Sequence, residues 1–283
     1  MVVPRVQRSN FESAERGRCM STPRISVVLP LLCPTPFLQA MAAFTIVTLR
    51  LHANHPFELV IAEASYDTFD PKHDLSGSAE GIKCSADVYL NFTPKIGAVK
   101  ESNAAIRAAS GEIIVATGSD VIVPPHWDTE LLRCFAQYKD CGAASLSAFE
   151  PGAIIGPPQP LDLVVEGFYS PFIAWRRGWE WSEDYIKIYQ DSDLILRMYE
   201  KGLRAYRSCR AHVHHLLRMT SDRVDTAQHD KDLAHDEKLF YQRWGKSPLA
   251  MFGVIRSGQY RYGNEYESWT NPIRLHHTPD VKD

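Results

Sequence analysis

Short apolar segments that alternate with helix-forming segments are the feature that most constrains the fold of this chain. The first, Ile25–Leu29, is rich in β-branched residues and stops at Pro30, as expected of a parallel strand buried on both faces. Similar segments follow at 57–62, 87–90, 112–116 and 143–146, separated by helical segments at 38–51, 98–109 and 127–138. The alternation predicts an α/β fold with a mainly parallel central sheet flanked by helices.

The alternation fades after residue 147, so we expect the chain to divide near that point. Residues 21–146 form the first half and residues 147–245 the second, which contains helical segments at 191–201 and 226–244. Gly202 and Gly245 follow these two segments as helix stop signals. We expect residues 1–20 to be an extension or a disordered tail, and residues 246–283 to be a C-terminal tail.

Charge and cysteine usage exclude some classes of protein. A net charge of −3 and a pI near 6.4 disfavour a protein that holds nucleic acid by bulk electrostatics. The six cysteines are scattered and form no C-x-x-C pair, so we expect small buried side chains in a reducing compartment. The predicted location is cytoplasmic.

A stretch without charged residues, 25–49, is long enough to span a bilayer. Three prolines interrupt it, at positions 30, 34 and 36, and a strand, a turn and a buried helix explain it better. A signal-peptide interpretation is also available, because arginines precede the stretch. Cleavage there would remove the first strand of the predicted sheet.

Ligands of parallel α/β sheets bind outside the carboxyl ends of the strands. Asp120 follows the segment 112–116 and is therefore placed to hold a divalent cation on a diphosphate. The alternative is a turn aspartate that caps its own loop.

Asp191 and Asp193 lie in the first turn of the helix predicted at 191–201, where the helix dipole stabilises negative charge. A carboxylate there that faces a cleft is a candidate general base for an alcohol. A simple N-terminal cap is the alternative.

The segment 211–215 contains three histidines. If it is extended, His212 and His214 lie on one face and His215 on the other. Binding of a metal by one of them, or contact with a nucleotide phosphate, would account for the cluster.

Taken in order, these segments resemble family-2 glycosyltransferases with the GT-A fold, over residues 24–245. The matching segments are the first strand with its proline at 25–30, a second strand at 57–65, a glycine and asparagine helix at 95–113, a D-x-D position at 118–120, an acceptor-side strand at 174–177, a catalytic-base helix at 189–204, the histidine strand at 211–215 and a C-terminal pattern at 238–245.

The resemblance implies an inverting transfer from a nucleoside-diphosphate sugar, with a UDP-sugar as the first expectation, to an acceptor hydroxyl. Residues 21–146 would bind the nucleotide sugar, and residues 147–245 would bind the acceptor and carry the base. Asp191 is the implied base and Asp193 the second candidate. The other implied contacts are Pro30, Glu63, Lys95, Asn103, Ser119 and Asp120 for the donor, Asp120 with His214 or His215 for Mn²⁺ or Mg²⁺, and Trp175, Trp179 and Trp181 for the acceptor.

The sequence departs from the family pattern at four places. Gly118 replaces the first aspartate of D-x-D, and Gln190 replaces the acid that commonly precedes the base. Leu31 and Leu32 replace the polar residues that often follow the first proline, and Glu63 replaces the second-strand aspartate. A non-catalytic sugar-nucleotide-binding protein is therefore an alternative. A nucleotidyltransferase is a weaker one, because residues 31–34 lack the glycine-rich, basic loop that such enzymes need. The acceptor stays open among a glycan, a protein, a lipid-linked sugar and a modified nucleobase.

Overall fold

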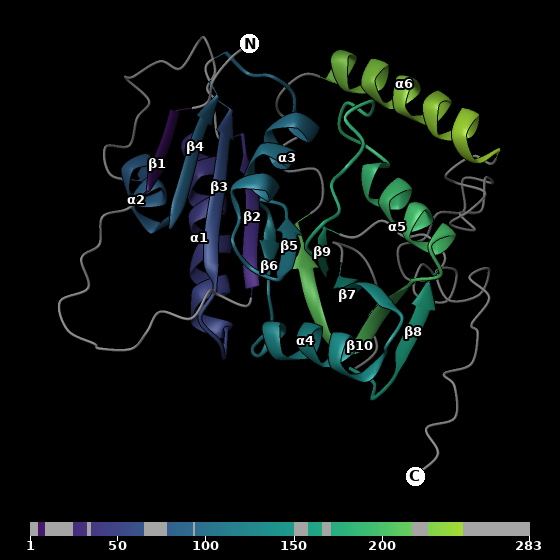
Figure 1. The fold of residues 1–283 in the computed structure, drawn as a ribbon. Coiled ribbons are helices and arrows are strands. Elements are labelled where there is room, and N and C mark those ends of the chain that lie inside the picture. The colour runs from purple at the N-terminus through teal and green to yellow at the C-terminus, as the bar shows by residue number, and fades with distance from the viewer. Residues whose placement is uncertain are drawn as a thin grey trace.

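The computed structural model describes residues 5–8, 25–32, 35–64, 78–92, 94–149, 158–165, 171–216 and 226–245. Within them, ten strands form one sheet in the order β1-β4-β3-β2-β5-β9-β7-β10-β6, with β8 paired to β10 (Figure 1). The strands are β1 (Arg5–Arg8), β2 (Ile25–Leu31), β3 (Glu58–Ala64), β4 (Val88–Phe92), β5 (Ile113–Thr117), β6 (Val121–Ile122), β7 (Cys141–Phe149), β8 (Asp162–Val165), β9 (Phe172–Arg176) and β10 (Arg204–His215). The helices are α1 (Pro36–His52), α2 (Ser78–Ser85), α3 (Ala98–Ala108), α4 (Trp127–Gln137), α5 (Gln190–Glu200) and α6 (Thr226–Trp244).

The first half of the sheet is parallel, as the alternation predicts. Strands β4, β3, β2 and β5 are neighbours, and every pairing among them is parallel. Successive residues of β2 enter different cores, because side chains alternate across a strand. Val27 packs in the core that contains residues of α1 and α4, and Val28 packs in the core that contains residues of α3 and α5. Burial on both faces explains why these strands are almost continuously apolar.

The second half of the sheet is mixed, which differs from the mainly parallel sheet expected. β9 lies antiparallel between β5 and β7, and β10 is parallel to β7 but antiparallel to β6 and β8. Parallel neighbours need a crossover helix. The regular alternation of strand and helix stops after residue 147, so several strands here join the sheet in the opposite direction. The α/β class is confirmed, and both predicted halves contribute strands to one sheet.

The charge-free stretch is divided between β2 and α1, as expected. In the described residues no helix has the length and apolarity that a membrane crossing requires. Cys134, Cys141 and Cys209 are buried free thiols, in agreement with the prediction, whereas Cys84 is exposed. Cys19, Cys33 and both predicted tails, apart from Arg5–Arg8, lie outside the described residues.

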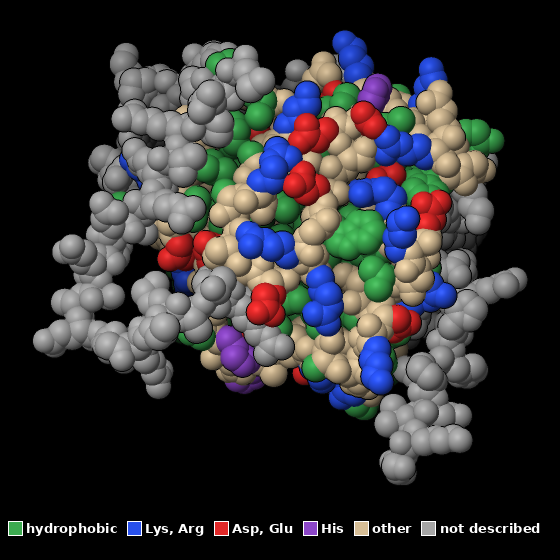
Figure 2. All heavy atoms as spheres, in the orientation of Figure 1, with side chains coloured by type: hydrophobic (Ala, Val, Ile, Leu, Met, Phe, Trp, Pro, Cys, Tyr) green, Lys and Arg blue, Asp and Glu red, His purple; other side chains and the backbone are tan. Residues whose placement is uncertain are grey.

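The last helix, α6, lies alongside α5 at one side of the molecule (Figure 1). A third small core, formed by Val99, Tyr185 and Phe240, joins α3, the segment before α5, and α6. On the face shown in Figure 2, acidic and basic side chains are interspersed, and neither sign dominates. This pattern agrees with the near-neutral composition.

Candidate functional site

The carboxyl ends of β2, β3 and β4 meet at one edge of the sheet, because these strands are parallel. Leu31 is in register with Glu63, and Glu63 with Asn91. Glu63 is therefore held where the three strands end, between Leu31 of β2 and Asn91 of β4. Burial raises the pKa of the Glu63 carboxyl, and a hydrogen bond with the Asn91 side chain opposes the rise.

The raised pKa of Glu63 predicts a pH dependence of stability. A raised carboxyl pKa means that the folded chain binds the proton more tightly than the unfolded chain. The contribution of this group to the free energy of unfolding therefore decreases as pH rises from its pKa in the unfolded chain to its pKa in the folded chain. Glu63→Gln removes the titration. We expect the melting temperature of Glu63→Gln, relative to that of the wild type, to increase as pH rises from about 4 towards neutral pH. A constant difference between the two proteins would contradict the assignment.

The turn after β5 brings Asp120 to the same edge of the sheet. Three backbone contacts hold the turn: Gly118 N–H donates to the Pro171 carbonyl, Thr45 Oγ1 donates to the Ser119 carbonyl, and Leu216 N–H donates to the Asp120 carbonyl. Ser119 and Asp120 are both largely buried. The backbone of the turn at Asp120 is thus held by contacts from α1, from Pro171 and from the residue after β10.

Gly118 accommodates the conformation of this carboxylate. A Cβ atom built on Gly118 would lie only 2.8 Å from Asp120 Oδ1. Any larger residue at 118, including the aspartate of a D-x-D motif, therefore requires the Asp120 carboxylate to move. Because residue 118 is glycine, the turn has one acidic ligand fewer than a D-x-D motif, and the Asp120 carboxylate can fold back over the turn.

His215 is the histidine that the fold brings to Asp120. It is 6% exposed, and its Nε2 atom lies 3.6 Å from Asp120 Oδ1. The antiparallel pairing of β10 with β6 sets this position, because it aligns His215 with Val121. His214 is exposed and stacks on Phe149, with ring centroids 4.8 Å apart. Burial and the neighbouring His214 lower the pKa of His212.

The Asp120 and His215 side chains fit a divalent cation as two ligands. Two atoms that bind one cation lie roughly 3–4 Å apart, and the 3.6 Å separation falls in this range. A mixed carboxylate and imidazole set suits Mn²⁺ better than Mg²⁺, which prefers oxygen ligands. Within the described residues no group of three or more His, Cys, Asp and Glu side chains forms a metal cluster. Diphosphate oxygens or water would have to complete the coordination shell.

The two aspartates of α5 have different environments. Asp191 is 7% exposed, and its Oδ1 accepts a hydrogen bond of 2.8 Å from Ser192 N–H in the first turn. Asp193 is 0% exposed, and its carboxylate is shared by four donors. These are Arg197 Nε at 2.8 Å, Trp244 Nε1 at 3.1 Å, and Tyr185 Oη and Arg243 Nη1, each at 3.3 Å. The contacts give Asp193 a structural role and leave Asp191 as the better candidate base.

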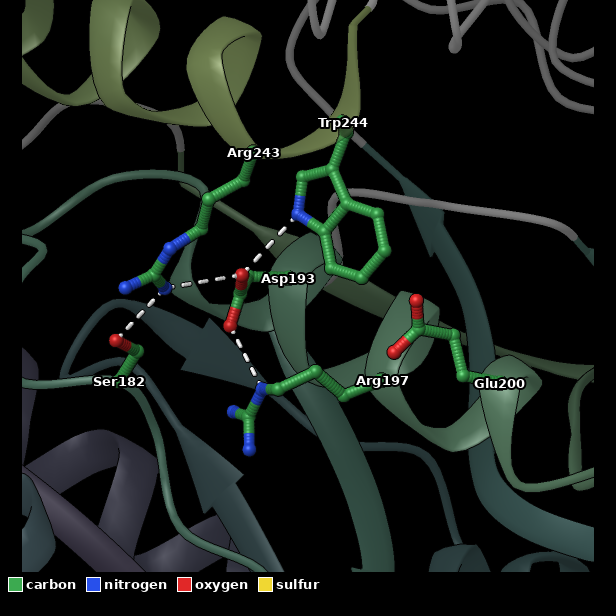
Figure 3. A pocket seen from close by; sticks show the side chains of 6 residues that line it. All are labelled: Ser182, Asp193, Arg197, Glu200, Arg243 and Trp244. Carbon is green, nitrogen blue, oxygen red and sulfur yellow. Dashed lines mark hydrogen bonds and ion pairs between the residues drawn. The ribbon is translucent and has the colours of Figure 1, made fainter.

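A pocket of about 410 Å³ opens between α5, α6 and Ser182 (Figure 3). Arg197, Arg243 and Trp244 surround the Asp193 carboxylate there, and Glu200 lies at the far end. Residues two apart on a helix point about 200° away from each other, so this pocket is on the opposite side of α5 from Asp191. The pocket is therefore separate from the place where Asp191 would act as a base.

Two residues expected to contact ligands are built into the core. Asn103 is 0% exposed: its Nδ2 donates to the Trp181 carbonyl at 2.8 Å, and its Oδ1 accepts from Trp181 N–H at 3.0 Å. Trp175 is also 0% exposed, and its indole N–H donates to the Trp179 carbonyl. The structure therefore gives both side chains a supporting role in the core, in place of the direct contact with donor or acceptor that the sequence predicted. Trp179 and Trp181 remain partly exposed, and Lys95 is exposed.

Comparison with solved structures identifies the fold. S. aureus TarS, residues 1–349, matches with a TM-score of 0.54 and 12% identity, over 89% of this chain and 81% of that chain. TarS 1–349 in complex with UDP-GlcNAc matches with a TM-score of 0.54 and 13% identity, over 88% and 81% of the two chains. The mannosyltransferase PcManGT from Pyrobaculum calidifontis, in complex with GDP-Man and Mn²⁺, matches with a TM-score of 0.55 and 18% identity, over 88% and 73%.

No family model matches the chain, and no curated protein matches its sequence. The likeness therefore rests on the arrangement of the strands and helices. The chain has the GT-A-like α/β fold of these nucleotide-sugar-bound structures.

Proposed function

We propose that this chain is a glycosyltransferase that moves a sugar from a nucleoside-diphosphate sugar to an acceptor hydroxyl, with inversion at the anomeric carbon. The observation that carries the proposal is the Asp120–His215 pair at the carboxyl edge of a GT-A-like sheet. Structures with this fold have been solved with UDP-GlcNAc and with GDP-Man and Mn²⁺. A cation-binding pair at that edge is what a diphosphate donor needs.

The donor would lie across the ends of β2, β3 and β5. Glu63 would accept hydrogen bonds from the donor's ribose or base, and Pro30 of β2 would contact the donor nearby. Ser119 and Asp120 would contact the diphosphate, and exposed Lys95 would offer a positive charge. A UDP-sugar remains the first donor to test.

Asp120 and His215 would hold Mn²⁺ or Mg²⁺. When bound, the cation supplies positive charge that stabilises the departing nucleoside diphosphate. Contacts from three segments hold the backbone of the turn that carries Asp120, and the pairing of β10 with β6 holds His215 beside it, so the two ligands would be preorganised before the donor arrives.

Asp191 would act as the general base. Its carboxylate takes the proton of the acceptor hydroxyl while the acceptor oxygen forms a bond to the anomeric carbon. The bond between that carbon and the diphosphate oxygen breaks, and its electron pair leaves with the nucleoside diphosphate. One displacement on the face opposite the leaving group inverts the anomeric configuration. The partly exposed rings of Trp179 and Trp181 are suited to the face of an acceptor sugar.

A non-catalytic sugar-nucleotide-binding protein is the second candidate, and Gly118 is the observation that favours it. Incubation with a panel of nucleotide sugars, with and without Mn²⁺, separates the two by the release of free nucleoside diphosphate. We expect metal-stimulated release. Donor binding without release would support the second candidate, and neither binding nor release would exclude both.

The two adjacent histidines give a matched test of the metal site. His215→Gln removes the imidazole that lies 3.6 Å from Asp120, whereas His214→Gln removes one that stacks on Phe149. We expect His215→Gln to raise the Mn²⁺ concentration for half-maximal activity by about 10-fold or more. His214→Gln should stay within about twofold of the wild type. The reverse order would assign the ligand to His214.

A further inference from the structure

We propose that Asp236 of α6 is a positioning residue for the Asp191 base, acting through the segment that leads into α5. This inference rests on the proposed function for the role of Asp191. The contact between α6 and the segment is independent of that function.

The Asp236 carboxylate binds three consecutive backbone N–H groups. Oδ1 accepts from Ile186 N–H at 2.9 Å, and Oδ2 accepts from Lys187 N–H at 3.0 Å and Ile188 N–H at 2.9 Å. Asp236 is 0% exposed, so water does not compete for these bonds. Successive N–H groups that converge on one anion form a nest, and here the anion comes from another helix 48 to 50 residues along the chain.

The residue that follows this nest has a strained backbone. Tyr189 has φ 66°, in the left-handed region, which non-glycine residues adopt only when their surroundings enforce it. Its ring packs against Phe240 of α6, with centroids 5.8 Å apart. Tyr189 is also the N-cap of α5, and Asp191 comes two residues later. Both groups that enforce this conformation, Asp236 and Phe240, belong to α6.

Two further contacts extend the attachment to α6. Lys187 Nζ lies 3.1 Å from Asp232 Oδ2, one helical turn before Asp236. At the other end of the helix, Arg243 contacts Ser182 and Asp193 (Figure 3), and it also contacts Asp184. The helix therefore contacts the segment 182–189 along its length and α5 itself through Asp193. Loss of the Asp236 charge should loosen the start of α5 while the other contacts keep the fold together.

The geometry distinguishes Asp236 from an ordinary helix cap. An ordinary cap satisfies N–H groups of its own helix. Asp236 instead satisfies N–H groups of a loop that ends two residues before the candidate base helix. Asparagine in its place presents an amide N–H₂ to at least one backbone N–H, so the nest cannot form fully.

The test compares Asp236→Asn with Asp230→Asn in the full-length chain. Asp230 is exposed on the same helix, so its variant removes the same charge without touching the nest. Hydrogen exchange of the amides of residues 186–191 is measured first. We expect about 10- to 100-fold faster exchange there in Asp236→Asn, and no change in Asp230→Asn.

Turnover and donor binding are measured on the same samples. We expect Asp236→Asn to lower kcat by about 10-fold or more while the Kd for UDP or GDP stays within about twofold, because Asp236 binds the segment before α5, whereas the candidate donor residues Glu63 and Asp120 lie at the ends of β3 and β5. Asp232→Asn, which removes the Lys187 ion pair and alters the hydrogen bond with Gln228 but leaves the nest intact, should have a smaller effect on both exchange and kcat.

Unchanged exchange at 186–191 in Asp236→Asn would overturn the contact. Faster exchange with an unchanged kcat would overturn the positioning role and leave the transferase intact. Equal losses of kcat and donor affinity would indicate general destabilisation and would also overturn it. If the wild-type chain turns over no donor, the proposed function fails, and the exchange pattern still decides whether Asp236 holds the start of α5.

Discussion

Asp191→Asn is expected to abolish sugar transfer while donor binding stays intact. Asparagine has nearly the same shape but cannot accept the proton of an acceptor hydroxyl, and positioned general bases contribute about 10²- to 10⁴-fold in rate. The Ser192 N–H bond to Oδ1 can survive the change, so the start of α5 should keep its structure. The loss should therefore appear in kcat, with the Kd for the nucleotide unchanged.

Glu200→Gln is the matched control for this variant. Glu200 is exposed at the other end of α5, so the substitution removes the same charge from the same helix. Steady-state kinetics and calorimetric titration with UDP or GDP measure both variants. Full activity of Asp191→Asn would remove the base from this position, and equal losses in both variants would point to the charge of the helix instead.

Asp193→Ala is expected to destabilise the fold by about 3 kcal/mol. The substitution removes an acceptor that is 0% exposed and leaves Arg197, Arg243, Tyr185 and Trp244 without it. Hydrogen bonds to charged groups contribute about 1.5–3 kcal/mol each, and loss of one partner of a buried pair costs about 3–5 kcal/mol. Both arginines are about 30% exposed, so water recovers part of that cost.

Urea unfolding at neutral pH measures this change, with Asp230→Ala as the control. The control should shift the free energy of unfolding by no more than about 0.5 kcal/mol, because its side chain is exposed. The activity of the folded Asp193→Asn protein separates structure from catalysis. If that protein is stable but inactive, Asp193 is the base after all.

The sequence was sufficient to predict the first half of the sheet because each strand there is a local apolar segment. Burial on both faces leaves a continuous hydrophobic pattern that needs no knowledge of the partner strands. The limits predicted for α6, 226 and 244, also agree with the structure, because the end of this helix has a local signal in Gly245. The alternation of side chains along a strand also predicted that His214 and His215 lie on opposite faces. The pairing of β10 with β6, which the sequence does not state, decides which of the two histidines faces Asp120.

The sequence could not reveal features that depend on contacts between distant segments. The insertion of β9 between β5 and β7 is one example, because no local pattern states the direction of a strand. The environments of Asp193 and Asp236 are others, because Arg243 and Trp244 approach Asp193, and Ile186 to Ile188 approach Asp236, from about 50 residues away in the chain. Asp232 and Asp236 lie one turn apart on α6, and no local pattern in the sequence singles them out. For the same reason, Asn103 and Trp175 resembled ligand contacts although both support the core.

The position of β9 also determines when the sheet can be completed during synthesis. β5 ends at residue 117, but the strand that covers its open edge ends at residue 176. At about 5–20 residues per second, a ribosome needs several seconds to make the intervening chain. During that time β5 presents unpaired N–H and C=O groups, which are a template for pairing with another nascent chain. A fragment that ends at residue 146 would keep this edge permanently, so we expect it to aggregate when it is expressed alone.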